Sequence, residues 1–152
     1  MGLQFLNQYR DFGLLILRLG IGGMFIFHGW PKIMGGPDMW ERVGGATSSI
    51  GINFAPTFFG FMAALTEFGG GVCLILGLLL RPVCILLMIN MIVATAMHLA
   101  NGDGLNVASH AIEDGVLFLS LIFIGPGRLS LDEKLGINGI KEETEKSNAS
   151  ST

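Results

Sequence analysis

The chain has 152 residues and a formal net charge of −3 at pH 7, with 14% charged and 51% hydrophobic residues. Soluble domains average about 25% charged residues, so this composition favours a membrane protein over a soluble globular domain. The sequence contains no basic cluster, which argues against a nucleic-acid-binding protein. We therefore predict one membrane domain, residues 1–130, followed by a polar tail, residues 131–152.

The first predicted membrane span, residues 12–34, carries Arg18, His28 and Lys32. At about 100° per residue, Lys32 lies about 40° and His28 about 80° from Arg18 around a helix, so all three are expected to project from one side. An ionisable group inside a spanning helix costs about 3 kcal/mol unless it is paired or hydrated. This side of the helix is therefore expected to face the interior of a bundle.

Three further spans are predicted at residues 56–80, 83–99 and 107–124, and the polar segment 38–54 is expected to fold over the membrane surface. The second span contains two rows of small residues at a spacing of four, which lets helix backbones approach closely in lipid. These rows are Gly60 with Ala64, and Gly69 with Cys73 and Gly77. The Arg81-Pro82 dipeptide predicts a tight turn, which makes the second and third helices antiparallel neighbours.

Four spans place both termini on one side of the membrane. That side collects six basic residues: Arg10, Arg81, Arg128, Lys134, Lys141 and Lys146. The opposite side carries only Lys32 and Arg42. The positive-inside rule therefore predicts a multi-pass protein with both termini in the cytoplasm. The polar tail lacks the apolar residues that packing needs and is predicted to be disordered.

Arg18 and Glu67 are predicted to form a buried ion pair between the first two spans. At a rise of about 1.5 Å per residue, their depths in the bilayer differ by only about 5 Å. A protonated Glu67 is the alternative, at a cost of about 3.7 kcal/mol. The pair has either a purely architectural role or a functional one, and the sequence leaves both open.

Six ionisable side chains from three spans are predicted in the outer third of the membrane: His28, Lys32, His98, His110, Glu113 and Asp114. Gathered together they would form a polar pocket that opens to the outer leaflet; taken singly, they would only meet head groups and water. A quinone head group suits such a pocket, because its carbonyls accept hydrogen bonds and its reduction takes up protons. We predict ligand binding by His28, Lys32, His98 and Asp114, and proton transfer by the catalytic residues His110 and Glu113. A metal site of His28, His98, His110 and Glu113 is an alternative by ligand type, although the isolated His110-x-x-Glu113 spacing does not by itself predict one.

Several motifs in this order resemble the DoxX family of small membrane proteins. They are Leu17-Arg18-Leu19-Gly20, Phe27-His28-Gly29-Trp30-Pro31-Lys32, Glu67-x-x-Gly70-Gly71, Leu76-Gly77-Leu78 with Arg81, His98, and Gly125-Pro126-Gly127-Arg128-Leu129-Ser130-Leu131-Asp132. The resemblance implies an all-α, four-helix bundle in a bacterial inner membrane. The family is named for a subunit of a thiosulfate:quinone oxidoreductase, and other members are linked to redox complexes.

The expected function is therefore that of a membrane subunit of a redox complex, which binds a quinone and holds no covalent cofactor. As an enzyme, the chain would be a subunit of a quinone-linked oxidoreductase. Expected partners are membrane lipid and other redox subunits or further copies of the chain. Two alternatives remain open: a non-catalytic accessory or scaffold subunit, and a proton-coupled carrier that uses Glu67 as its relay.

Overall fold

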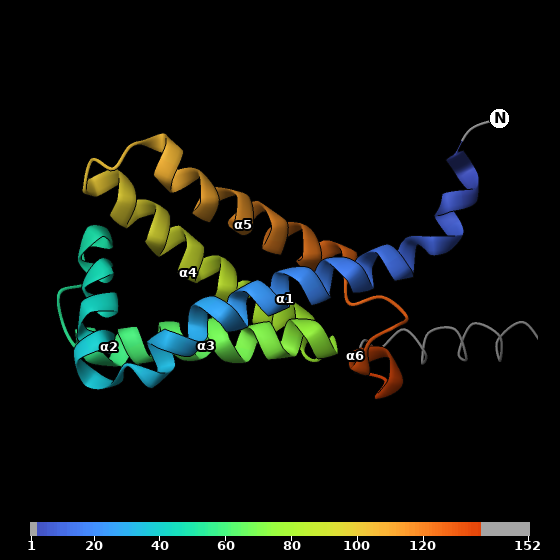
Figure 1. Ribbon diagram of the computed structural model, residues 1–152, viewed down its shortest axis with the longest axis horizontal. Helices are drawn as coiled ribbons and strands as arrows, with labels where there is room; N and C mark the ends of the chain where they lie inside the picture. Colours follow the sequence, from blue (N-terminus) through green and yellow to red (C-terminus); the bar gives the residue numbers. More distant parts are fainter. Residues whose placement is uncertain (1–2, 138–152) are drawn as a thin grey trace, which may run out of the picture.

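The computed structural model describes residues 3–137, and its regular elements are helices. In chain order they are η1 (Leu3–Tyr9), α1 (Arg10–Met34), α2 (Gly36–Gly44), η2 (Gly45–Ile50), α3 (Pro56–Leu76), α4 (Leu80–Ala100), α5 (Leu105–Ile124) and α6 (Leu131–Lys134) (Figure 1). Four helices, α1, α3, α4 and α5, are long and apolar enough to cross a membrane. The predicted all-α class and the existence of four spans are thus confirmed.

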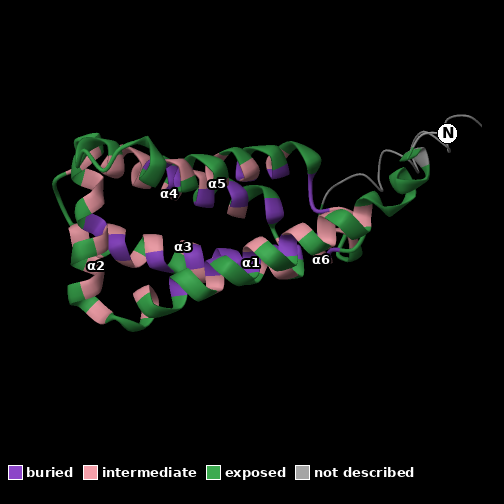
Figure 2. Ribbon diagram, turned by 45° about the horizontal axis from the view of Figure 1, so that its top comes forward, coloured by how far each residue is buried: buried purple, intermediate pink, exposed green. Residues whose placement is uncertain are grey.

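The four long helices form two antiparallel pairs, in which α1 packs along α3 and α4 packs along α5 (Figure 1). The pairs converge at the end of the molecule that carries α6, the α6 end. They separate toward the end that carries α2 and η2, the α2 end (Figure 2). The rings of Phe25 on α1 and Phe118 on α5 meet edge-on, 5.0 Å apart, within the shared core. The interior is therefore closed by packing in the middle, and the two helix pairs diverge toward the α2 end.

Glycines fix the register between α1 and α3. A Cβ atom placed on Gly22 would lie 2.7 Å from the carbonyl oxygen of Gly71, and one on Gly29 would lie 2.5 Å from the amide nitrogen of Phe68. Only glycine allows backbones to come this close. Gly69, the first residue of the second predicted row, does not make this contact, because a Cβ there would meet no atom within 4 Å.

The segment that was expected to lie over the membrane surface forms α2 and η2. A Cβ atom on Gly60 would lie 1.7 Å from the carbonyl oxygen of Trp40, and one on Gly44 would lie 1.8 Å from that of Pro56. These contacts hold α2 directly against the first half of α3. Since η2 in turn contacts α4, the segment bridges the two helix pairs at the α2 end.

The break between α3 and α4 falls at residues 77–79, before the predicted Arg81-Pro82 turn. Gly77 has a left-handed backbone with φ of 64°. The amide of Leu78 donates to the carbonyl of Cys73 at 2.9 Å, which completes a Schellman-type helix end. Pro82 is the third residue of α4, where its missing N–H removes no intrahelical hydrogen bond. The predicted boundaries at 80 and 83 are therefore wrong by a few residues.

The polar tail was predicted to begin at residue 131, and this boundary is wrong for residues 131–137. The Ser130 side chain accepts a hydrogen bond from the Glu133 amide at 3.2 Å and caps α6. Asp132 is only 2% exposed. Its carboxylate accepts hydrogen bonds from the amides of Leu79 at 2.7 Å and Leu80 at 2.9 Å, at the start of α4. The rest of the predicted disordered tail, 138–152, lies outside the described residues.

Candidate functional site

A cavity of about 530 Å³ opens at the α2 end, between the two helix pairs. It is lined by residues of α1, α2, η2, α3 and α4. The polar residues of this α2-end cavity are Lys32, Arg42, Thr47, Thr66, Glu67, Asn90 and His98. The remaining lining is mostly aliphatic side chains, with methionines and Phe59. Its volume falls in the range of about 300–1,000 Å³ that is typical of small-molecule sites.

An ion pair between α1 and α3 lies on the wall of this cavity. Lys32 Nζ donates to both carboxylate oxygens of Glu67, at 2.8 Å to Oε1 and 2.6 Å to Oε2. The Glu67 side chain is 9% exposed and that of Lys32 is 32% exposed. Lys32 is held in turn by Trp40, whose indole Nε1 donates to the Lys32 carbonyl at 3.0 Å. The pair is therefore built into the junction of α1, α2 and α3.

The predicted pair of Arg18 with Glu67 is wrong, and the register of α1 against α3 is the reason. Gly29 lies against Glu67 and Phe68, so the carboxylate is level with the last turn of α1. Arg18 lies against Gly77, where a Cβ would collide with its guanidinium. Glu67 is thus within reach of Lys32 and remote from Arg18.

Arg18 lies at the α6 end and is 1% exposed. Its Nη2 donates to the carbonyl oxygen of Leu129, which precedes α6. Asp132 is close enough to interact electrostatically with this guanidinium. The segment that follows α5 therefore supplies one hydrogen-bond acceptor and one negative charge to Arg18, while its Nε and Nη1 are buried without a hydrogen-bond partner among the described residues.

His98 lies in the last turn of α4 and also lines the α2-end cavity. Its Nδ1 is 2.8 Å from Asp103 Oδ2 in the loop before α5. This contact fixes the orientation of the imidazole ring at the cavity. Further along α4, Asn90 Nδ2 donates to the carbonyl oxygen of Ala63 on α3 at 3.1 Å and ties the two helix pairs together.

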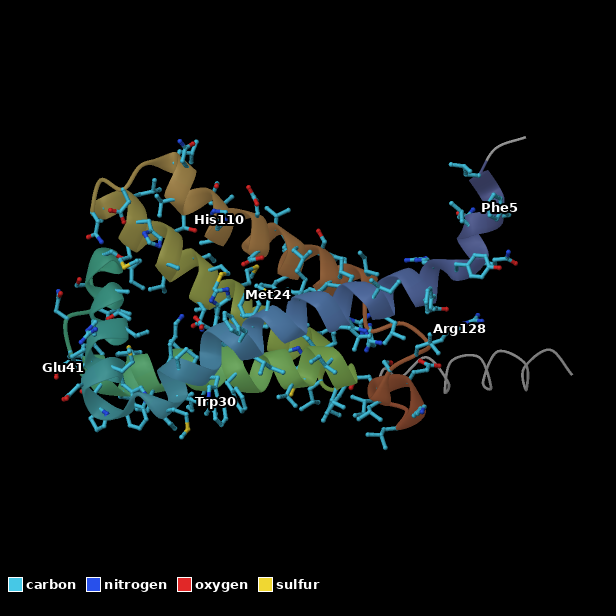
Figure 3. All side chains as sticks on the ribbon, viewed as in Figure 1. Phe5, Met24, Trp30, Glu41, His110 and Arg128 are labelled. Carbon is cyan, nitrogen blue, oxygen red and sulfur yellow. The ribbon has the colours of Figure 1, made fainter. Side chains whose placement is uncertain are left out.

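The other predicted site residues form a second cluster, on α1 and α5, which does not line the α2-end cavity. His28 is exposed on α1, and His110 and Glu113 are exposed on α5; in Figure 3, His110 lies near the α2 end. Asp114 is half-buried and interacts electrostatically with Glu113, His110 and His28. The expectation of one pocket is corrected to a cavity with Lys32 and His98 and a separate surface cluster.

Within residues 3–137, His, Cys, Asp and Glu side chains do not gather in any group of three or more that could bind a metal ion. Cavity residues that sequence reasoning missed include Asn90, Thr66 and Arg42. The sequence could have identified Asn90 as a residue that faces the interior, because it is a polar residue in the middle of an apolar span, where its amide needs a partner. Arg42 had no comparable signal, since its place depends on how α2 folds back onto α3.

The comparison with known proteins agrees with this architecture. The family model described as DoxX matches residues 13–100. The chain is 31% identical over 85% of its length to an uncharacterized protein of Haemophilus influenzae, covering 95% of that protein. It is 32% identical over 80% of its length to an uncharacterized membrane protein of Mycobacterium tuberculosis, covering 80% of it. It is also 28% identical over 86% of its length to the inner membrane protein YqjF of Escherichia coli, covering 97% of it.

No solved structure matches the chain. The family match covers more than half of the 152 residues and includes most of α1 and all of α2, η2, α3 and α4, the helical elements that line the cavity. The matched relatives include proteins named as membrane proteins, in agreement with the four apolar helices. This chain is a membrane protein that belongs to the DoxX family.

Proposed function

We propose that the chain binds a quinone, or a similar lipid-soluble ligand with a polar head, in the α2-end cavity and works as a membrane subunit of a redox complex. The observation that carries the proposal is the combination of apolar and polar residues that line the cavity. Its aliphatic walls reach down between α3 and α4, and a lysine, a carboxylate, an asparagine and a histidine share the same space. An amphipathic ligand with a hydrogen-bonding head satisfies both parts of this lining.

The residues that line the cavity suit the polar head of such a ligand. A bound quinone supplies a carrier for electrons and protons. Lys32 and Asn90 offer N–H donors that the carbonyl oxygens of a quinone accept. The contact of Nδ1 with Asp103 leaves Nε2 of His98 to interact with the ligand. The Lys32–Glu67 pair holds a proton beside the same space and is in position to exchange it.

The two clusters have different parts in this proposal. Lys32 and His98 contact the ligand directly. His28 and Asp114, predicted as ligand-binding residues, and His110 and Glu113, predicted as proton carriers, lie away from the cavity lining. We assign them proton exchange at the surface of α1 and α5. In this proposal, electrons come from another subunit of the redox complex, and this chain binds the quinone within the membrane.

We also propose that both termini face the cytoplasm, so that the α2-end cavity opens to the outer leaflet. Basic residues at the α6 end, Arg10, Arg81, Arg128 and Lys134, outnumber Lys32 and Arg42 at the α2 end. We expect a green fluorescent protein fused to the C-terminus to fluoresce and an alkaline phosphatase fused there to be inactive. The opposite pair of results would place the cavity on the cytoplasmic side.

Ligand binding is tested by titrating decyl-ubiquinone into the purified protein in nanodiscs and following the quenching of tryptophan fluorescence. We expect saturable quenching, because Trp40 is hydrogen-bonded to Lys32 at the cavity wall. Val93 lines the cavity, so Val93→Phe should fill it and weaken binding by about tenfold, equal to about 1.4 kcal/mol. Val116→Phe on α5, outside this cavity, is the matched control and should leave the affinity unchanged.

A second candidate function, that of a non-catalytic accessory subunit, is favoured by an apolar groove of about 470 Å³ between α4 and α5. Small residues, Ala96, Ala111 and Gly115, line this groove and would allow a helix of another subunit to approach. The glycines of α3 at 60, 70 and 71 are already used inside the chain. Absence of saturable quinone binding, together with a stoichiometric membrane partner in mild detergent, would favour this candidate over the quinone site.

A further inference from the structure

We propose that the α6 end binds the phosphodiester of an anionic phospholipid, in a second cavity that Arg10, Arg81 and Arg128 line together. This α6-end cavity has a volume of about 570 Å³ and lies at the opposite end of the bundle from the proposed quinone site. Its three arginines come from three separate segments: the start of α1, the start of α4, and the segment after α5. The inference is independent of the proposed function.

The three arginines lie near the ends of helices that are long and apolar enough to cross a membrane, where the phosphates of phospholipids are expected. Arg10 is the first residue of α1, Arg81 is the second residue of α4, and Arg128 follows the end of α5 by four residues. The cavity therefore lies at the ends of three membrane spans, at the head-group level (Figure 3 shows Arg128 at the α6 end). Basic pockets between spans at this level are suited to lipid head groups.

A carbonyl of α5 orients the guanidinium of Arg81, and Asp11 contacts Arg128, whose side chain is 87% exposed. Arg81 Nε donates to the carbonyl oxygen of Ile122 in the last turn of α5, at 3.1 Å. The backbone amide of Arg128 donates to Asp11 Oδ1 at 3.1 Å, and its Nε lies 3.8 Å from Asp11 Oδ2. Arg81, whose guanidinium is already oriented, loses less side-chain entropy when it binds phosphate oxygens.

The balance of charge and apolar surface selects the class of lipid. Asp11 and Glu133 also line the cavity, so its three arginines exceed its carboxylates by one. This excess matches the single negative charge of a phosphodiester whose head group has no compensating amine, as in phosphatidylglycerol. The apolar side chains of Leu14 and Ile124 line the same cavity and would contact the glycerol backbone and the first methylenes of the acyl chains.

The test measures lipid binding to the detergent-solubilised full-length protein by native mass spectrometry, with phosphatidylglycerol, phosphatidylethanolamine or inorganic phosphate as separate probes. We expect phosphatidylglycerol to bind more tightly than either of the other two. The double variant R10Q/R128Q should weaken its binding by about tenfold or more, because charge-assisted contacts to the phosphate are lost. R42Q, at the α2 end, is the matched control and should bind like the original chain.

R81Q provides a second variant in which Arg10 and Arg128 stay in place, and it too should weaken binding of phosphatidylglycerol. The proposal is overturned if phosphatidylethanolamine or inorganic phosphate binds as tightly as phosphatidylglycerol. It is also overturned if R42Q loses as much affinity as R10Q/R128Q. Unchanged affinity in both R10Q/R128Q and R81Q would overturn it as well. Thermal unfolding of each variant in detergent, without added lipid, separates loss of the site from loss of the fold.

Discussion

Replacing Lys32 by Met is expected to lower the free energy of unfolding by about 3 kcal/mol, because it leaves a buried carboxylate without its partner. Glu67 receives both of its side-chain hydrogen bonds from Lys32 Nζ, and its side chain is 9% exposed. The methionine keeps most of the apolar stem that lysine packs against its neighbours. The change therefore removes the charge with little loss of packing. Reversible unfolding in mixed detergent micelles, followed by circular dichroism, measures the difference.

The double variant Lys32→Met/Glu67→Leu is expected to recover most of this loss, since two apolar residues of similar size replace a buried ion pair at little net cost. Lys134→Met, on α6 and exposed, is the matched control and should leave stability nearly unchanged. If the double variant were no more stable than Lys32→Met, the loss would come from packing at residue 32. The pairing of Lys32 with Glu67 would then contribute nothing measurable.

The long helices could be predicted because hydropathy over about 20 residues is a local property of the sequence. The residues at which these helices end were harder to predict. Gly77 ends α3 because its left-handed backbone completes a Schellman-type cap, whereas the sequence pattern emphasised the proline at residue 82. Both residues are typical of helix boundaries, and hydropathy does not choose between them.

The buried face of α1 could be predicted in part. Arg18, Gly22, Phe25 and Gly29 are its buried residues, and they repeat at a spacing of four and three along one side of the helix. The two glycines bring α3 onto their own side, which turns His28 away from the interior. The prediction weighed only the ionisable residues of this helix and therefore included His28 on the inner side.

The partner of Glu67 could not be predicted because it depends on how far one helix is shifted along another. Depths counted from predicted helix ends placed Arg18 and Glu67 within about 5 Å of each other, which an arginine side chain can span. The actual register is set by backbone contact of Gly22 with Gly71 and of Gly29 with Phe68. Several glycines in each span offer such contacts, and the sequence alone does not say which of them meet.

For the candidate site too, the sequence predicted which residues have a similar depth, but it did not predict which helices pack together. Lys32 and His98 were expected to lie together, and they share the α2-end cavity. His110, Glu113 and Asp114 were expected in the same place because they have a similar depth. Depth says nothing about which helix pair a residue belongs to, and α5 pairs with α4 and contributes no residue to the lining of this cavity.

Replacing Asp132 by Ala is expected to lower the free energy of unfolding by about 3 kcal/mol or more, although the residue lies outside the four spans. Its buried carboxylate accepts hydrogen bonds from the amides of Leu79 and Leu80, and bonds to a charged group contribute about 1.5–3 kcal/mol each. The same carboxylate lies at the positive end of the α4 dipole and interacts with the buried Arg18. Its removal leaves two amides and one guanidinium without their acceptor or counter-charge.

Asp132→Asn keeps an oxygen acceptor but removes the negative charge, so we expect it to cost less than Asp132→Ala and more than the exposed control Lys134→Ala. If Asp132→Asn and Asp132→Ala lower the free energy of unfolding equally, the charge of the side chain is essential and its shape is not.

Asp132 and Lys32 lie at opposite ends of the bundle and share no contact partner in the described chain. The losses from Asp132→Ala and Lys32→Met should therefore add within about 0.5 kcal/mol when the two changes are combined. A loss from Asp132→Ala no larger than that from Lys134→Ala would show that α4 begins, and Arg18 stays buried, without this carboxylate.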